Sequence, residues 1–394
     1  MEGAPQALLP ARLSTASPSH PDRFSLRRLG RISLIVVSLI GAAVASRLLA
    51  QEARLRPAEE LSFPSPTDGN SAAFWWDGEL RLFTSIGWPL RLSRAENQFG
   101  AWETSRVGAR DFRDRTLWVE AAWVDTDGTV FGWYHHEPGG LYEDSYLTAP
   151  KIGALVSFDG GESVHDLGFI LESGDELDDD ARNGFFAGGH GDVSVVLDRE
   201  RTYFYFFFTN YGGPAESQGI VTARLAYADR FKPAGRVQKY FQGAWSEPGL
   251  GGRTTPIFRA ARTWHHRDPD SFWGPSVHWN THLGCYVMLM NHAQGDPGWA
   301  QEGIYISYGV DPEVPGKWSK ALKLLDATEI PNWSTFYPQV MGMESGGTDS
   351  QAGRVARFYL NGTSKHEIVF SRTANPPLPS QPELPDEMPR DIRH

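Results

Sequence analysis

"GGHGDVSVVLDRERTYFYFFFTNYGG", residues 188–213, is the stretch that decides the fold of this chain. A glycine-rich polar segment leads into a β-branched run, an acidic turn follows, and consecutive aromatic residues come next. This pattern predicts two antiparallel strands joined by a tight turn. His190 and Asp192 stand at the start of the first strand, where a buried strand has no need of polar side chains.

The same hairpin pattern recurs along the chain, with further copies that begin near Asn70, Trp118, Gly274 and Tyr337. Several copies are followed by one more short strand. Steps of roughly 50 to 85 residues between copies are typical of radially repeated sheets. The sequence therefore predicts an all-β fold, a five-bladed β-propeller of four-stranded antiparallel blades. A β-sandwich with unequal loops is the competing interpretation.

Composition agrees with many short strands and narrows the class of partner. Of the 394 residues, 12% are aromatic, and 41 Gly and 27 Pro supply turns. The formal net charge of −11 excludes a chain-wide basic surface, so we expect no nucleic-acid partner. A neutral oligosaccharide or polysaccharide remains a suitable ligand, because aromatic faces can stack on sugar rings.

Both ends of the chain differ in composition from the repeats. A basic segment precedes the apolar run 32–46, which ends in small side chains with Ala43-Val44-Ala45 as a cleavage signal. Residues 1–50 are therefore predicted to be an export signal that sends the protein to the periplasm or the cell exterior. The alternative is an uncleaved segment that tethers the chain to a membrane. Residues 373–394, rich in Pro and charge, are predicted to form a disordered tail, which leaves 60–372 for the propeller.

Polar residues near the start of each repeat form the candidate site. In a propeller the innermost strand of each blade lines the central channel, so the strand starts converge on one end of the axis. The candidates are, in chain order, Asp68, Asn70, Glu120, His190, Asp192, Trp273, Ser276, Tyr337 and Gln339. We expect carboxylates from three blades to face one shallow pocket.

Two segments carry a resemblance to a known family. "WGPSVHWNTHLGCYVMLM", from Trp273, and "ISYGVDPEVPGKWSKALKLL", from Ile306, are similar to segments of the five-bladed β-propeller glycoside hydrolases. Arabinanases, β-xylosidases and invertases share that fold. The resemblance covers about residues 60–372. It implies hydrolysis of a glycosidic bond by a first-blade base or nucleophile, a third-blade orienting acid, and a fourth-blade general acid just before Gly-Pro.

Carried over by position, the resemblance fits some of these roles and not others. Asp192 matches the orienting acid, and either Asp68 or Asn70 matches the first-blade residue. Trp273 stands before Gly274-Pro275, where the family has its general acid, so the chain departs from the pattern there. Glu120, in an apolar stretch, is then the predicted proton donor, beside Asp68 as base. The alternative is a propeller that binds carbohydrate, or serves as a scaffold, without cleaving.

The remaining predictions concern ligand contacts and ions. The predicted sugar-binding residues are Asn70, His136, His190, Trp273, Ser276 and Gln339. Alternation along a strand should point His135 and His136 to opposite faces. "SFDGGESV", from Ser157, resembles a degenerate Asp-box turn of sialidase propellers, which adds a sialidase-like hydrolase as a third alternative.

We predict no cofactor and no catalytic metal. The acidic segment "DELDDDARN", from Asp175, offers oxygen ligands for a structural calcium ion, yet it lacks the EF-hand spacing. A solvated acidic loop is the other interpretation of this segment.

Overall fold

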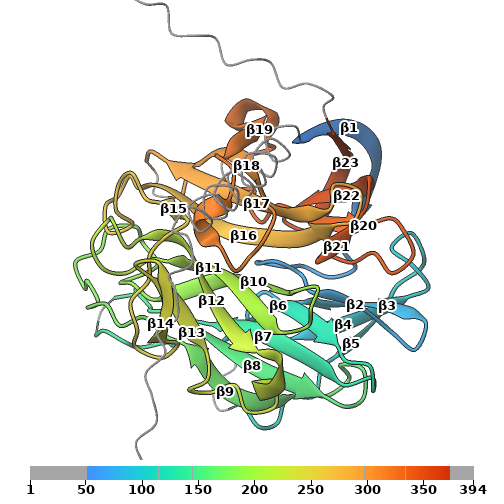
Figure 1. Ribbon diagram of the computed structural model, residues 1–394, viewed down its shortest axis with the longest axis horizontal. Coiled ribbons are helices and arrows are strands. Elements are labelled where there is room, and N and C mark those ends of the chain that lie inside the picture. The colour runs from blue at the N-terminus through green and yellow to red at the C-terminus, as the bar shows by residue number, and fades with distance from the viewer. Residues whose placement is uncertain (1–50, 113–115, 144, 297–298, 333, 373–394) are drawn as a thin grey trace, which may run out of the picture. The chain divides into compact units, whose positions relative to one another are not determined.

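The computed structural model describes residues 51–112, 116–143, 145–296, 299–332 and 334–372. The described chain forms five β-sheets and contains no α-helix, only short 3-10 turns (Figure 1). The turns are η1 (Tyr227–Asp229), η2 (Pro315–Lys317) and η3 (Ala327–Glu329). The predicted five-bladed propeller is thereby confirmed. The predicted export signal, 1–50, and tail, 373–394, lie outside the described residues.

The first two blades are plain four-stranded antiparallel sheets. The first blade is made of β2 (Ala73–Trp76), β3 (Glu79–Thr84), β4 (Arg91–Ala95) and β5 (Glu103–Arg106). The second is made of β6 (Leu117–Val124), β7 (Val130–His136), β8 (Lys151–Ser157) and β9 (His165–Leu171).

The third and fourth blades are larger than predicted. The third contains β10 (His190–Leu197), β11 (Tyr203–Asn210), β12 (Gly219–Ala226), β13 (Gln238–Phe241), β14 (Ala244–Pro248) and the short β15 (Phe258–Arg259). The fourth contains β16 (Asp270–Asn280), β17 (Cys285–Gln294), β18 (Gln301–Gly309) and β19 (Leu322–Asp326). A two-residue strand, β21 (Gln351–Ala352), adds to β16 in parallel.

The fifth blade joins the two ends of the described chain. It contains β20 (Gln339–Gly342), β22 (Val355–Leu360), β23 (Thr363–Arg372) and β1 (Gln51–Ser62), with β1 antiparallel to β23. Because β1 covers the outer edge of β23, sheet hydrogen bonds tie the start of the propeller to its end. The sheets thus include residues from Gln51 on, before the boundary expected at residue 60.

Buried side chains gather between blades, which is why the strands are apolar on both faces. Separate clusters join the first blade to the second, the second to the third, the third to the fourth, the fourth to the fifth, and the fifth back to the first. Phe206 of β11, for example, lies in the cluster shared by the second and third blades, and its neighbour Phe207 in the cluster shared with the fourth. The aromatic run Tyr203–Phe208 therefore fills two interfaces at once.

Hydrogen bonds also connect the starts of the inner strands. The Asn70 side chain donates to the carbonyl of Pro275 (2.9 Å), which links the first blade to the fourth. Gln339 of β20 accepts from Ser71 N–H (2.7 Å) and donates to Ser71 C=O (3.1 Å). These contacts bring strand starts that are far apart in sequence to one end of the propeller. Within the described ranges, no helix has the length and apolar character needed to cross a membrane.

Candidate active site

A cavity of about 350 Å³ opens at the end of the propeller where the inner strands start. Its three acids are Asp68, before β2; Glu137, just after β7; and Asp192, in β10. Its aromatic wall includes Trp118, Phe186, Trp273, Trp299, Phe336 and Tyr337. Blades one to four and the segment that leads into the fifth all contribute, so the cavity lies on the axis.

The aromatic side of the cavity is closely packed. Trp273 is 2% exposed and packs edge-on against Trp299, with ring centroids 4.9 Å apart. The ring centroids of Trp264 and Trp299 are 4.5 Å apart, and Trp264 lies behind this wall. Such a wall can stack on the apolar face of a sugar ring. Trp273 therefore lies where a sugar-binding residue is expected, and its indole cannot serve as the acid that the family has at this position.

Asp192 is buried at the base of the cavity in an unusual backbone conformation. Its φ is +52°, and the register of β10 against β11 shifts between Gly191 and Ser194. The Tyr211 hydroxyl donates a hydrogen bond to Asp192 Oδ2. Burial is the main reason that the pKa of Asp192 is raised to about 7; His135 and Tyr211 act against the rise, and the Glu120 charge adds to it. This register shift is a β-bulge, and it points the Asp192 carboxyl group into the site. That group carries a proton for part of the neutral pH range.

Glu120 lies behind the cavity lining and is 2% exposed. Val193 N–H donates to its Oε2 at 2.5 Å, and a Cβ atom on Gly69 would stand only 2.7 Å from its Oε1. Burial raises the pKa of Glu120 to about 8, with the hydrogen bond from Val193 acting against that rise and Asp68 adding to it. Because both oxygens are covered, Glu120 is poorly placed for the direct proton-donor role that the sequence suggested.

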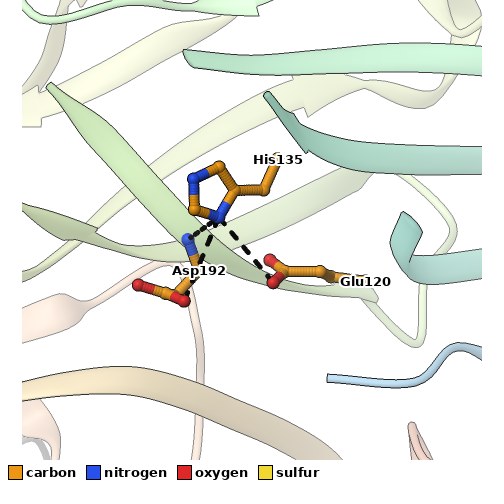
Figure 2. Close-up of side chains that lie close together, drawn as sticks. All are labelled: Glu120, His135 and Asp192. Carbon is orange, nitrogen blue, oxygen red and sulfur yellow. Dashed lines mark hydrogen bonds and ion pairs between the residues drawn. The ribbon is translucent and has the colours of Figure 1, made fainter. Parts of the chain in front are cut away.

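His135 stands between the buried acids, as Figure 2 shows. Its Nδ1 lies 3.9 Å from Glu120 Oε1 and 4.0 Å from Asp192 Oδ1, and it accepts a hydrogen bond from Asp192 N–H at 3.3 Å. Donor atoms of the three side chains lie within 4.8 Å of one another, a spacing that suits a metal ion. However, the one lone pair of Nδ1 already faces a backbone N–H, and Glu120 Oε2 accepts another. The arrangement fits a hydrogen-bonded group better than a metal centre.

Two acids at the cavity remain accessible to water. Asp68 is exposed and hydrogen-bonds to Tyr337; partial burial raises its pKa, while His135 and Tyr337 lower it. Glu137 is 28% exposed, and its Oε1 lies 3.4 Å from His135 Nε2. Burial raises the pKa of Glu137; His135 acts against that rise, and the neighbouring carboxylates add to it. The residues thus offer one more exposed and one half-buried carboxyl group, and burial raises the pKa of both.

Glu137 and His135 line the cavity but are absent from the predicted site residues. They are two positions apart at the end of β7, so their side chains share one face. The intervening His136 points away, and its Nδ1 lies 2.9 Å from the carbonyl of Thr116. The opposite orientation of the two histidines was expected, but which one faces the axis depends on register. The signal that could have found Glu137 is its position just past that strand end.

The other predicted ligand-binding residues do not line the cavity. Asn70 and Gln339 hold neighbouring backbone, as described above. Ser276 pairs with Leu289 within the fourth blade. His190 is buried, with its Nδ1 3.1 Å from the carbonyl of Gly189, and burial lowers its pKa well below the usual value. His190 therefore packs inside the third blade, with its ring against Phe208 of β11.

Two motifs act locally in the fold. In the Asp-box-like turn, Asp159 accepts hydrogen bonds from Ser163, and the carbonyl of Gly160 accepts one from Arg81 of the first blade. In the acidic segment, Asp178 Oδ2 lies 3.0 Å from His265 Nδ1. The turn does not contribute to the axial cavity, and the acidic segment contributes only its last residue, Asn183.

No protein-family model matches the chain, and no curated protein matches it. Solved structures resemble it in fold. An α-L-arabinofuranosidase from Lactobacillus brevis is 12% identical, with 79% of this chain and 95% of that chain covered and a TM-score of 0.48. A thermostable family-43 glycoside hydrolase is 12% identical, with 79% of this chain and 92% of that chain covered and a TM-score of 0.47. An endo-arabinase from Bacteroides thetaiotaomicron is 13% identical, with 78% of this chain and 94% of that chain covered and a TM-score of 0.44. The chain is thus structurally similar, at low identity, to five-bladed β-propeller glycoside hydrolases, and this likeness concerns the fold alone.

Proposed function

We propose that this protein hydrolyses a glycosidic bond in the axial cavity. The observation that supports the proposal best is the meeting of Asp68, Glu137 and Asp192, from three successive blades, beside one aromatic wall. Glycoside hydrolysis needs two carboxyl groups whose environments separate their pKa values. An exposed acid and more buried acids in one small cavity meet that need.

Asp68 is suited to act as the base. It is the most exposed of the cavity acids; burial raises its pKa, while His135 and the hydrogen bond from Tyr337 act against that rise and favour the ionised form. Asp192 is suited to an orienting and charge-tuning role, because it is buried and held by Tyr211. Glu120 supports it from behind, since a second buried carboxyl raises the pKa of Asp192 through like-charge repulsion.

The cavity favours a neutral sugar over an acidic one. Among the described residues that line it, none is Lys or Arg, and three are acids. An anionic sugar would meet like charges with no cation to pair its carboxylate. This lining speaks against the sialidase-like alternative.

A screen of full-length protein tests the proposal. The probes are oligosaccharides and aryl glycosides of arabinose, xylose, galactose and fructose, with product release followed by chromatography. We expect release from at least one, and Asp68→Asn and Asp192→Asn should each reduce kcat/KM by about 10²-fold or more. The exposed pair Arg94–Glu103 on the outer strands of the first blade supplies a control, because Glu103→Gln should leave turnover unchanged.

The screen also decides on the binding-only alternative, which Trp273 favours by standing where the family has an acid. Calorimetric binding of a sugar to the wild-type protein, with no release from any probe, would overturn the proposed hydrolysis. Sugar binding that is weakened by Asp192→Asn would then assign the cavity a carbohydrate-binding role. Release that survives both substitutions would place the chemistry elsewhere.

A further inference from the structure

Glu137 differs from the other acids of the site in its access and its attachment. Its side chain is 28% exposed, whereas those of Glu120 and Asp192 are 1% and 4% exposed. Its backbone is held on both sides, since Glu137 N–H donates to Thr116 C=O (3.1 Å) and the next carbonyl, of Pro138, accepts from Thr148 (2.7 Å). A carboxyl group on this fixed backbone can reach a ligand in the cavity.

The imidazole of His135 lies beside this carboxyl group. Because His135 Nδ1 accepts the N–H of Asp192, the proton of the neutral ring is on Nε2. Nε2 lies 3.4 Å from Glu137 Oε1, and no closer polar partner of Nε2 is found among the described residues. The contact is longer than a good hydrogen bond, so it can tighten when Glu137 becomes negatively charged.

The described part of the fourth blade supplies no acid to the cavity. Its residues there are Trp273 and Trp299, whose indoles do not donate protons to a leaving group at neutral pH. Glu120 is covered, Asp192 is held by Tyr211, and Asp68 is the most hydrated. One accessible and only partly hydrated carboxyl group is left.

We infer that Glu137 is the general acid of the site, donating its proton to the glycosidic oxygen from the second blade; this inference rests on the proposed function. The Glu137 proton moves to that oxygen while the bond from the oxygen to the anomeric carbon breaks. A water molecule forms the new bond to the anomeric carbon and gives one proton to the Asp68 carboxylate. One water is consumed, and both acids return to their starting states by proton exchange with solvent.

The dependence on leaving group tests this role. The probes are a natural-type oligosaccharide and the 2,4-dinitrophenyl glycoside of the same sugar, chosen as one that the wild-type protein cleaves. Departure of dinitrophenolate needs no proton, so only the oligosaccharide depends on an acid. Glu137→Gln should reduce kcat/KM for the oligosaccharide by about 10²-fold or more and for the dinitrophenyl glycoside by less than about tenfold. Asp68→Asn should reduce both alike.

The outcomes separate this inference from the proposed function. If the wild-type protein cleaves both probes and Glu137→Gln affects them equally, or neither, Glu137 is not the acid while the hydrolase proposal stands. If the wild-type protein cleaves nothing, both fail together. Thermal unfolding of Glu137→Gln controls for folding. Glu137→Asp, which keeps a carboxyl group, should retain more oligosaccharide cleavage than Glu137→Gln; equal loss in the two would also contradict the assignment.

Discussion

The backbone N–H of Val193, in the third blade, donates a 2.5 Å hydrogen bond to Glu120, in the second. This bond joins two neighbouring inner strands directly below the cavity. It also keeps Glu120 close to Asp192, the residue before Val193, so that the two acids influence each other's ionisation. The same contact therefore serves the fold and the electrostatics of the site.

Removing this acceptor should destabilise the propeller. Glu120→Ala leaves the buried Val193 N–H without its partner, which costs about 1–3 kcal/mol in the free energy of unfolding. Glu120→Gln keeps a carbonyl oxygen at the same place and should cost less. Urea unfolding of the two variants measures the difference, and equal stability would mean that the hydrogen bond contributes little.

Stability should fall as the pH rises across the neutral range. The pKa values of Asp192 and Glu120 are raised to about 7 and about 8 in the folded chain, so the folded state holds more protons than the unfolded state above about pH 4. Their contribution is fully present below the unfolded values and is lost as the pH rises through 7 and 8. A difference of one pKa unit between the folded and unfolded states corresponds to about 1.4 kcal/mol in the free energy of unfolding.

Unfolding measured between pH 5 and pH 8.5 checks this slope. Asp349, whose pKa burial also raises to about 7, should contribute to the same trend away from the cavity. The combined variant Asp192→Asn with Glu120→Gln should therefore flatten the slope without abolishing it. An unchanged slope in that variant would show that the two acids are not the source.

Gly69 should tolerate no side chain. Its φ is +148°, and an added Cβ would stand 2.7 Å from Glu120 Oε1. Gly78 is a matched control, since its φ is +81° but nothing lies within 4 Å of an added Cβ. Gly69→Ala should lower the melting temperature more than Gly78→Ala, and it alone should disturb the site. If both substitutions lowered the melting temperature equally, backbone strain alone would explain the effect, and the contact with Glu120 would contribute nothing.

Tyr211 should adjust the ionisation of Asp192. Its hydroxyl donates to the Asp192 carboxylate, and this hydrogen bond lowers the pKa of Asp192. Tyr211→Phe should therefore raise that pKa above its present value of about 7. A pH titration followed by ¹³C NMR of the carboxyl carbons can detect the change, and a fall or no change in the pKa would contradict it.

β1 should be required for a stable fold. A chain that begins at Gln51 keeps the strand that pairs with β23, whereas one that begins at Phe63 exposes the edge of the fifth blade. We expect the shorter chain to unfold at a lower temperature and to aggregate. Similar melting temperatures for the two chains would show that closure does not need β1. If residues 1–50 are an export signal, as we propose, cleavage before Gln51 would spare this strand.

The repeated hairpins could be predicted from sequence because their inner strands are buried between blades. The run Tyr203–Phe208 has aromatic side chains on both faces, and no exposed strand needs that pattern. β1 gave no such signal. Its sequence, QEARLRPAEELS, is largely polar, since an outer strand is held mainly through backbone pairing with β23, more than 300 residues away.

The candidate site could be predicted only in part, because strand register decides which side chains face the axis. Asp68, Glu120 and Asp192 do come together, as their positions at the strand starts suggested. A shift between Gly191 and Ser194 separates His190 from Asp192, and another, between Val119 and Ala121, accompanies Glu120. Such bulges depend on three-dimensional packing, so sequence alone could not choose between His135 and His136.

A ligand-bound crystal structure of the Asp68→Asn variant tests the central claim most directly. Crystals soaked with arabino-, xylo- and galacto-oligosaccharides should show a sugar ring in the axial cavity, packed against Trp273, with Glu137 within hydrogen-bond distance of the glycosidic oxygen. A sugar bound only outside this cavity, or a cavity that holds water alone in every soak while the wild-type protein cleaves the same oligosaccharide, would contradict the account.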